Sequence, residues 1–405
     1  MHQVGGAILE KILDADRGHR GPRVPCDQGH EAEFVGYRGK ELQTILSRIR
    51  VNRAYYHCRI CNTGTVPKDI DLDIVSTSFS PGVRRLMARV GGKEAFDEGR
   101  RDLEALAGIF VKTKEVERVS EAIGEEIEAV SRRERKAVLS GKIVQIQPVP
   151  IMYVAVDGTG VPMVPHETEG RQGKDETGRA KTREAKLGAV FTQVNVDADG
   201  RPIRDEGSTT YVGAIETAEE FGQRIFTEAI RRGARFAKQM IVLGDGAPWI
   251  WNLAAEHFPG AIEIIDLYHA REHLTGIAKV LYGPGSAEAK QWADARIAEL
   301  DTGNVEAVLS AMARLRPRND AIKDEVRRTI GYFQTNAERM RYSQFRRQGL
   351  FVGSGVIEAG CRIIAGRRLK QSGRRWTGKG ANAILALRCC ELSGRTEQYW
   401  EHRAA

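Results

Sequence analysis

An acid follows each of two short apolar runs, and this pattern most constrains the fold of the chain. Asp157 comes directly after the run 152–156, and Asp245 comes after the run 241–244. Both acids are followed by a glycine, and short apolar runs with such boundaries are typical of buried strands. An acid at the carboxyl end of a buried strand lies in the crevice where α/β sheets usually bind ligands. The pattern therefore predicts an α/β sheet with two acids poised at a binding edge.

The elements around these acids alternate. We expect three strands that can pair in antiparallel fashion, then a helix, a strand, a helix and a last strand. Their expected ranges are 152–156, 187–196 and 208–215 for the first strands, 219–232 and 249–257 for the helices, and 240–243 and 261–265 for the later strands. The glycine- and charge-rich stretch 166–181 is predicted to be a loop. Residues 270–345 and 356–391 are helical by pattern and would cover the sheet.

A third acid, Glu358, follows Gly353-Ser354-Gly355, and Ser354 is a suitable N-cap for a helix that begins near Val356. The macrodipole favours the ionised form of a carboxylate in the first turn of a helix. Hard cations such as Mg²⁺ (or Mn²⁺) bind a few carboxylate oxygens and keep several waters. Three acids on separate elements therefore indicate a magnesium site. The alternative for each aspartate is a residue that caps a turn.

Composition excludes several classes of protein. The chain has 405 residues, 41% of them hydrophobic and 29% charged, and a net charge of +8. A mostly disordered or fibrous chain does not have this composition. No apolar run approaches the roughly 18–20 residues that span a bilayer, and no secretory signal is visible, so we expect a cytoplasmic protein without a membrane partner. The modest basic excess suits a nucleic-acid partner but is weak evidence alone.

Three of the six cysteines lie in the first 61 residues, beside a histidine. Cys26-x-x-x-His30 and Cys58-x-x-Cys61 form two halves separated by a strand-like stretch. Zn²⁺ takes four tetrahedral nitrogen or sulfur ligands, and a close pair on each of two turns supplies them. We predict a structural zinc ribbon here. His57 competes with His30 as the fourth ligand, and a reduced surface cysteine pair is the alternative.

Two further segments suggest contact with DNA. Residues 96–130 have a helix–turn–helix pattern in which Lys112 and Lys114 lie at the start of the second helix, where recognition helices usually read bases. The remainder of that helix is acidic, so a helical packing unit stays open as the alternative.

The second segment runs from 359 to 390, has no acid, and is predicted to neutralise phosphates beside Glu358. Trp376 within it offers a stacking surface for a base. The alternative is a basic helix face that only meets solvent. The bases of this tract are Arg362, Arg367, Arg368, Lys370, Arg374, Arg375, Lys379 and Arg388.

Five motifs in order resemble bacterial insertion-sequence transposases of the DDE type, with the ISKra-type elements, related to Mutator-like transposases, as the most similar group. The motifs are 156–159, 182–188, 244–251, 265–269 and 353–358. The resemblance implies an RNase H-like fold with Asp157, Asp245 and Glu358 as the catalytic triad and two Mg²⁺ (or Mn²⁺) ions. Asp266 and His269 match the acid-x-x-His motif of such enzymes. They would act near the metals or touch DNA, unless they are a strand-end cap and an ordinary half-buried histidine.

The resemblance also implies an order of domains and a set of partners. The expected segments are an N-terminal helix (1–20), a zinc-ribbon-like domain (21–72), a helix–turn–helix-like region (76–141), the first part of the catalytic domain (148–269), a helical insertion (270–350) and the second part (351–395). The partners are double-stranded DNA, both the terminal inverted repeats and the target, and a second copy in a homodimer or higher oligomer. Such a protein works on the bacterial nucleoid.

The predicted reaction is metal-assisted cleavage at the ends of the element, followed by transfer of the 3′-OH to target DNA. Two other functions stay open. One is an RNase H-like nuclease, such as a junction resolvase, that only hydrolyses DNA. The other is a defective or domesticated DNA-binding derivative, which the intact acids argue against.

Overall fold

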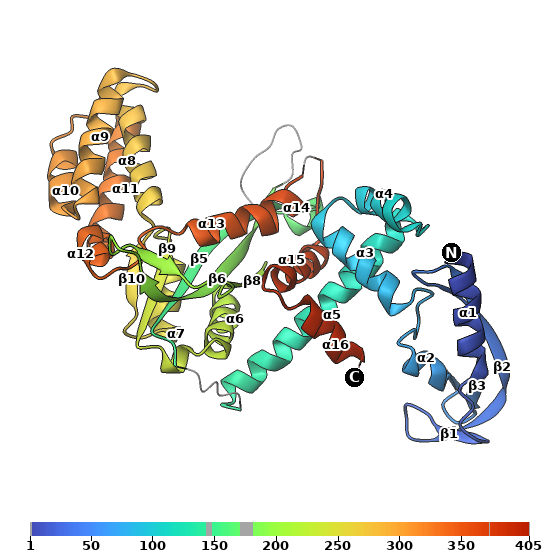
Figure 1. Cartoon of the computed structure of the whole chain (residues 1–405). Helices are drawn as coiled ribbons and strands as arrows, with labels where there is room; N and C mark the ends of the chain where they lie inside the picture. Colours follow the sequence, from blue (N-terminus) through green and yellow to red (C-terminus); the bar gives the residue numbers. More distant parts are fainter. Residues whose placement is uncertain (1, 143–147, 171–180, 372, 405) are drawn as a thin grey trace. The chain divides into compact units, whose positions relative to one another are not determined.

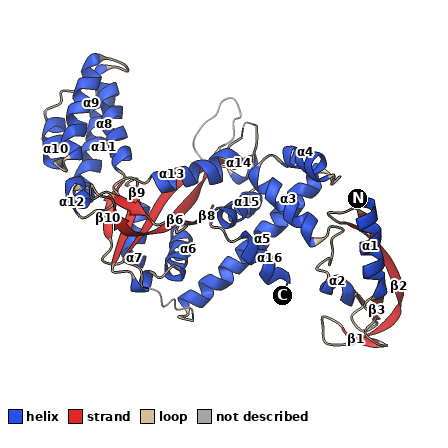
Figure 2. Ribbon diagram, in the orientation of Figure 1, coloured by secondary structure: helices blue, strands red, loops and turns tan. Residues whose placement is uncertain are grey.

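Two compact units make up the chain, and they are described here separately. The computed structural model describes residues 2–142, 148–170, 181–371 and 373–404 (Figures 1 and 2). The first unit comprises residues up to 124 together with those from 397 on, and the second comprises 125–396. Helix α5 (Thr113–Leu139) and helix α16 (Thr396–Ala404) each contribute residues to both. Among the helices that the structure describes, none combines the length and apolar character needed to cross a bilayer.

The first unit is built on an antiparallel sheet in the order β1-β2-β3-β4. Its strands are β1 (Arg23–Pro25), β2 (Glu31–Gln43), β3 (Arg48–Cys58) and β4 (Thr63–Thr65). The long hairpin of β2 and β3 carries a separate core at each end. Leu42, Ile49, Val51 and Ile74 form one, and the Cys/His cluster lies in the other. The helices of this unit are α1 (His2–Ala15), α2 (Pro67–Asp71), α3 (Pro81–Lys93) and α4 (Phe96–Ala107), with the first part of α5.

The predicted α/β sheet is present in the second unit. Strand order is β10-β9-β5-β6-β7, and β8 also pairs with β6. β5 is antiparallel to β6 and parallel to β9, which is parallel to β10. The strands are β5 (Ile151–Pro162), β6 (Thr182–Val196), β7 (Pro202–Arg204), β8 (Thr210–Ala214), β9 (Gln239–Gly244) and β10 (Ile262–Ile265). β5 and β6 are longer than predicted because their hairpin continues past Asp157, and β7 was not predicted. Of the predicted loop 166–181, residues 171–180 lie outside the described part of the chain.

Helices cover both faces of this sheet, so its central strands are buried and almost wholly apolar. α6 (Ala218–Arg231) packs on the face of Gly188, where Phe221 and Ile225 leave no room for a larger side chain. α13 (Gly355–Cys361) packs on the opposite face, against β5 and β6. α7 (Pro248–His257) contacts α6, and α15 (Gly378–Leu392) contacts β8. The short helices at Pro165–Glu167 and Ala234–Phe236 lie in connections between these elements.

The predicted helical insertion follows β10 (Figure 1). Each of its main helices packs against the next, and the last returns to the first. They are α8 (Leu267–Tyr282), α9 (Ala287–Asp301), α10 (Val305–Ala313) and α11 (Asp320–Thr335). A short turn (Ala337–Met340) and α12 (Tyr342–Arg347) then lead back to the sheet. Beyond α13 the chain forms a π-helix (Arg362–Gly366) and α14 (Arg367–Leu369), within the region 356–391 that was predicted to be helical.

Candidate functional site

Asp157 and Asp245 occupy matching positions along neighbouring parallel strands. The register of β5 and β9 pairs Ala155 with Leu243, and each acid comes two residues later in the chain. Asp245 follows the end of β9 as predicted, but Asp157 lies within β5, because the hairpin with β6 extends that strand to Pro162. The negative charge of Asp245 acts on Asp157 and contributes to raising the pKa of that carboxyl.

The carboxyl group of Asp157 has a raised pKa. Burial is the main cause, and the neighbouring Asp245 adds to it. Hydrogen bonds from the Cys361 thiol and from the Gly158 N–H oppose the shift, the latter donating to Asp157 Oδ1 at 2.7 Å. Burial disfavours the charged form of an acid, and a nearby cation favours it. A bound divalent cation would therefore compensate for a charge that this site makes costly, which fits a metal ligand.

Glu358 lies on α13, which crosses strand β5. The side chain of Glu358 is exposed, while Cys361, three residues later, contacts the carboxylate of Asp157. Residues three apart lie on the same side of a helix, so Glu358 projects from the side of α13 that carries Cys361. The ligand atoms of the three acids do not lie together as a compact group that could hold a metal ion. Among the described residues, the one such group is formed by Cys26, His30, Cys58 and Cys61.

Cys361 is a site residue that the sequence analysis did not single out. Burial, together with the charge of Asp157, strongly raises the pKa of its thiol. The thiol therefore remains protonated and donates its hydrogen bond to Asp157. Its spacing from Glu358 was the available signal, but a lone cysteine in an apolar helix is usually a small core residue.

Asp266 has the structural role that the sequence analysis left open. It is 5% exposed and is the N-cap of α8. Its Oδ1 accepts the N–H of His269 at 2.6 Å, and its Oδ2 accepts the N–H of Ser354. Ser354 is the N-cap residue of α13 as predicted, although its side chain makes no capping hydrogen bond. Asp266 thus fastens the start of the Glu358 helix to the end of β10.

His269 lies next to Asp266 and is half-buried. Its ring meets the ring of His273 edge-on, with centroids 5.0 Å apart, and its Nδ1 lies 3.8 Å from Glu272. A positive charge on His269 would favour the ionised form of Asp157 and so lower the pKa of that carboxyl. His269 therefore lies close enough to Asp157 to influence that carboxylate electrostatically.

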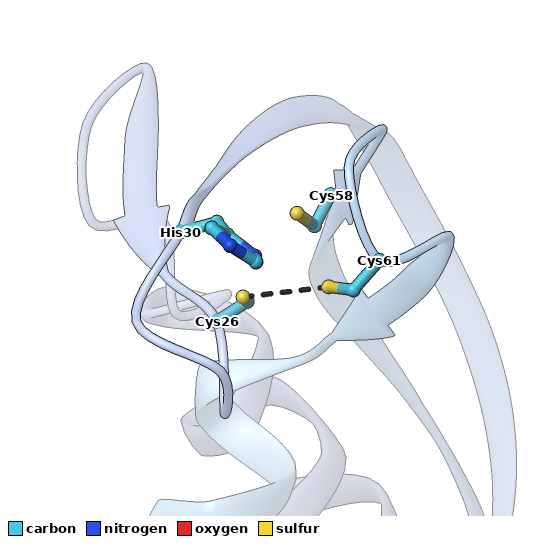
Figure 3. A group of neighbouring side chains, drawn as sticks. All are labelled: Cys26, His30, Cys58 and Cys61. Atoms are coloured by element: carbon cyan, nitrogen blue, oxygen red, sulfur yellow. Dashed lines mark hydrogen bonds between the residues drawn. The ribbon is translucent and has the colours of Figure 1, made fainter.

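The Cys/His cluster comes together in the first unit (Figure 3). One ligand atom each from Cys26, His30, Cys58 and Cys61 can be chosen so that all lie within 4.8 Å of one another. The Sγ atoms of Cys26 and Cys61 are 3.5 Å apart. The ring atom Nδ1 of His30 is buried and makes no hydrogen bond with any residue that the structure describes. Tetrahedral zinc accepts two or three thiolates with imidazole, so this donor set fits a closed structural zinc site.

The backbone explains why His30 joins this cluster and His57 does not. The Cys26 N–H donates to the His30 carbonyl at 2.7 Å, and Gly29 takes a φ of 78°, which closes a tight turn. His57 is the residue before Cys58 on β3, and successive side chains of a strand point to opposite faces. Of the two histidines, His30 is thus the ligand candidate.

The basic tract divides into exposed and buried members. Arg368 is 0% exposed, and its guanidinium carbon lies 4.9 Å from the centroid of the Trp376 ring. Trp376 is 6% exposed and donates from Nε1 to the Leu369 carbonyl at 3.0 Å. Both residues lie in the interior, where the guanidinium of Arg368 covers the face of the Trp376 ring. The sequence had instead suggested that they contact DNA.

Arg388 is also buried, at 6% exposed, while the remaining bases of the tract keep more of their surface. Arg374 is half-buried, and Lys370 donates to the Thr159 hydroxyl. Lys379 forms an ion pair with Glu125 at 3.0 Å. The exposed members of the tract are Arg362, Arg367, Lys370, Arg375 and Lys379.

Lys112 and Lys114 are exposed at the start of α5 in the first unit. The Lys112 N–H donates to Glu115 Oε2 at 2.7 Å, and Lys114 pairs with Glu117 at 2.8 Å. Thr113 is the first residue of the helix and donates to Asp97 of α4. Ser120 of α5 donates to the Met87 carbonyl of α3, so α5 is also part of a packed helical unit.

Comparisons with known proteins add little to this geometry. Residues 222–404 match the model of an uncharacterised protein family, UPF0236. No curated protein matches the chain. The matched family carries no activity in its description, so the DDE-transposase resemblance remains a prediction.

Two solved structures are similar at a low level. One is a Drosophila P element transposase strand transfer complex, with a TM-score of 0.20 and 9% identity over 63% of this chain and 66% of that chain. The other is NurA bound to dAMP and manganese, with a TM-score of 0.10 and 12% identity over 73% of this chain and 65% of that chain. The chain thus spans just under two thirds of either. TM-scores of this size do not establish a shared fold, so the function proposed below rests on the residues of the site.

Proposed function

We propose that the chain is a DDE-type DNA transposase with an RNase H-like catalytic domain. The observation that carries the proposal is the matched position of Asp157 and Asp245 on adjacent parallel strands, with the Glu358 helix packed across β5. The sequence of strands, with β5 to β8 paired in antiparallel fashion and β9 and β10 then added parallel to β5, also supports it. The finer assignment to ISKra-type elements rests on the motif series alone.

Asp157, Asp245 and Glu358 are proposed to hold two Mg²⁺ or Mn²⁺ ions. A pair of such ions supplies activation of the attacking oxygen and stabilisation of the leaving oxygen in phosphodiester cleavage. The chain's own part is to present hard carboxylate oxygens, which Mg²⁺ prefers. Cys361 fixes the orientation of Asp157 through its thiol, and Asp266 holds the start of α13 so that Glu358 stays near the strand ends.

Exposed bases next to the acids are proposed to bind the DNA backbone. Arg362, Arg367 and Lys370 follow Glu358 within four helical turns and are exposed. Such cations bind phosphates without reading sequence, and the release of counterions makes their contribution depend on salt. Lys112 and Lys114 are proposed to contact the element ends, and a dimer or higher oligomer would hold two ends together.

The Cys/His cluster is proposed to hold a structural Zn²⁺. The site uses four protein ligands, which leaves no open position for a substrate. Its role would be to stabilise the β2–β3 end of the first unit, where few apolar side chains are buried.

The experiment that tests the proposal measures strand cleavage by the whole protein with Mn²⁺ or Mg²⁺. Supercoiled plasmid serves as a general probe, and duplexes carrying the inverted repeats that flank the gene serve as the specific one. The variants Asp157→Asn, Asp245→Asn and Glu358→Gln keep the side-chain shape but remove a negative ligand. We expect each to lose cleavage and to retain binding to the duplex.

Asp199→Asn is the matched control, since Asp199 is 67% exposed in its ion pair with Arg201 in the connection between β6 and β7. It should cleave as the wild type does. Cleavage without transfer of the 3′-OH to a target would favour the nuclease alternative. Undiminished cleavage by all three variants would overturn the proposed triad.

A further inference from the structure

Tyr332, a residue of the helical insertion, reaches the turn that carries Asp245. It lies on α11, and its hydroxyl donates to the main-chain carbonyl oxygen of Asp245 at 2.9 Å. The two residues are 87 positions apart in the chain. The hydrogen bond therefore ties the insertion to the backbone of a proposed metal ligand without using the carboxylate itself.

The ring of Tyr332 also fits closely against the next residue of the turn. Gly246 has a φ of +102°, in the left-handed region that favours glycine. A Cβ at this position would lie 2.5 Å from Cε2 of Tyr332. The turn is closed on its other side by the Ala247 N–H, which donates to Asp245 Oδ1 at 2.9 Å. The orientation of the Asp245 side chain thus depends on a turn that Tyr332 covers.

Tyr332 is itself held by the insertion. The ring of His273 on α8 stacks on it with centroids 4.1 Å apart and an angle of 28° between the planes. Phe333 meets it edge-on at 5.4 Å. Burial lowers the pKa of His273, and the neighbouring His269 lowers it further, so His273 stacks as a neutral ring. The ring of Tyr332 is therefore packed by residues of α8 and α11, while its hydroxyl reaches the Asp245 turn.

We propose that Tyr332 is a positioning residue through which the helical insertion sets the orientation of Asp245 for metal binding. The proposal rests on the proposed function, because it assigns a task to that same acid. Its physical basis is that a metal ligand on a loosened turn samples more orientations, and the cation must then order it on binding. The insertion is thus part of the metal-binding machinery, although it supplies no ligand.

The test is Tyr332→Phe in the full chain. This change removes the hydroxyl and keeps the ring that packs on Gly246 and His273. Tyr342→Phe is the matched control, because Tyr342 is 0% exposed and its hydroxyl makes no hydrogen bond with any described residue. Both changes remove a buried or half-buried hydroxyl, but only the first removes a bond to the Asp245 turn.

Two readouts are measured. Amide hydrogen exchange of residues 245–247 in protein without Mn²⁺ should become about threefold to tenfold faster in Tyr332→Phe, the range for loss of one net hydrogen bond. The Mn²⁺ concentration that gives half-maximal plasmid nicking should rise by a similar factor, with a smaller change in the maximal rate. Tyr342→Phe should match the wild type in both.

Unchanged exchange and unchanged Mn²⁺ dependence in Tyr332→Phe would overturn the proposal. Equal effects in the two variants would also overturn it, because they would show a general loss of packing. If plasmid nicking by the wild-type protein does not depend on Mn²⁺, the proposed function is overturned. The amide exchange of residues 245–247 would still decide whether Tyr332 orders the turn.

Discussion

Replacement of His30 by alanine should release zinc and unfold the adjacent end of the first unit. In the core described around the cluster, the large buried side chains that are not themselves ligands are Val24 and Tyr56, and Phe34 packs against this core while only partly buried. Full burial of a large apolar side chain is worth roughly 1.5–3 kcal/mol, so these two contribute about 3–6 kcal/mol. Structural zinc contributes roughly 10–16 kcal/mol of apparent binding free energy at neutral pH. The metal therefore dominates the stability of this end of the hairpin.

Loss of one of four ligands should weaken zinc binding by more than the 10- to 100-fold typical of changes in residues that only orient a ligand. Zinc per chain is measured by atomic absorption, and affinity by competition with a chromophoric chelator. Proteolysis between residues 22 and 34, or between 54 and 65, reports local unfolding at the cluster end of the hairpin. The core of Leu42, Ile49, Val51 and Ile74 should stay protected, because it lies at the other end of the hairpin.

His57→Ala is the control, since His57 is next to Cys58 in sequence but lies outside the cluster. It should retain zinc and resist protease as the wild type does. Purified wild-type protein without zinc, or equal zinc loss in the two variants, would refute the reasoning.

Three further predictions concern the second unit. Burial raises the pKa of Asp157 in the folded state, so the contribution of this carboxyl to stability falls as the pH rises from the ordinary aspartate pKa through the raised one. Asp157→Asn should therefore have a Tm no lower than that of the wild type at pH 7 without Mg²⁺. A clearly lower Tm would contradict this. Replacement of both Arg367 and Arg375 by alanine should reduce the slope of log K against log salt concentration, for binding to a random duplex, by roughly 0.9 per lost phosphate contact. Replacement of the exposed Arg327 and Arg328 by alanine should leave this slope unchanged. Trp376→Ala should lower the free energy of unfolding by about 3–5 kcal/mol in urea denaturation, because the side chain is buried, and a loss below 1 kcal/mol would argue for a surface role.

The two aspartates gave a local signal, since each follows a short apolar run typical of a buried parallel strand. Asp245 does follow the end of β9, but Asp157 lies within β5. The ends of β5 and β6 could not be found in this way, since glycines at 158 and 160 suggested a turn where the hairpin in fact continues. Periodicity also could not show the π-helix, because Arg362–Gly366 is much shorter than the window over which a helical period can be judged.

The directions in which side chains of the site point could not be predicted from the sequence. A run of arginines shows the sign of the charge but not which guanidinium turns inward, so Arg368 could not be distinguished from Arg367. The choice between His30 and His57 depended on the geometry of the turn at Gly29. Tyr332 gave no signal at all, since its contact with Asp245 bridges two distant segments of the chain.

The π-helix between α13 and α14 makes the length of this segment a constraint of its own. A π-helix holds one more residue than an α-helical turn, so deleting one residue from Arg362–Gly366 would restore ordinary α-helical hydrogen bonding. Arg368 would then be one residue nearer to Glu358 along the chain, whereas Trp376 is held in place by its N–H bond to the Pro162 carbonyl at 3.0 Å. The guanidinium of Arg368 would therefore leave the ring of Trp376. Relatives that keep this arrangement must therefore conserve the number of residues between these positions more strictly than the residues themselves.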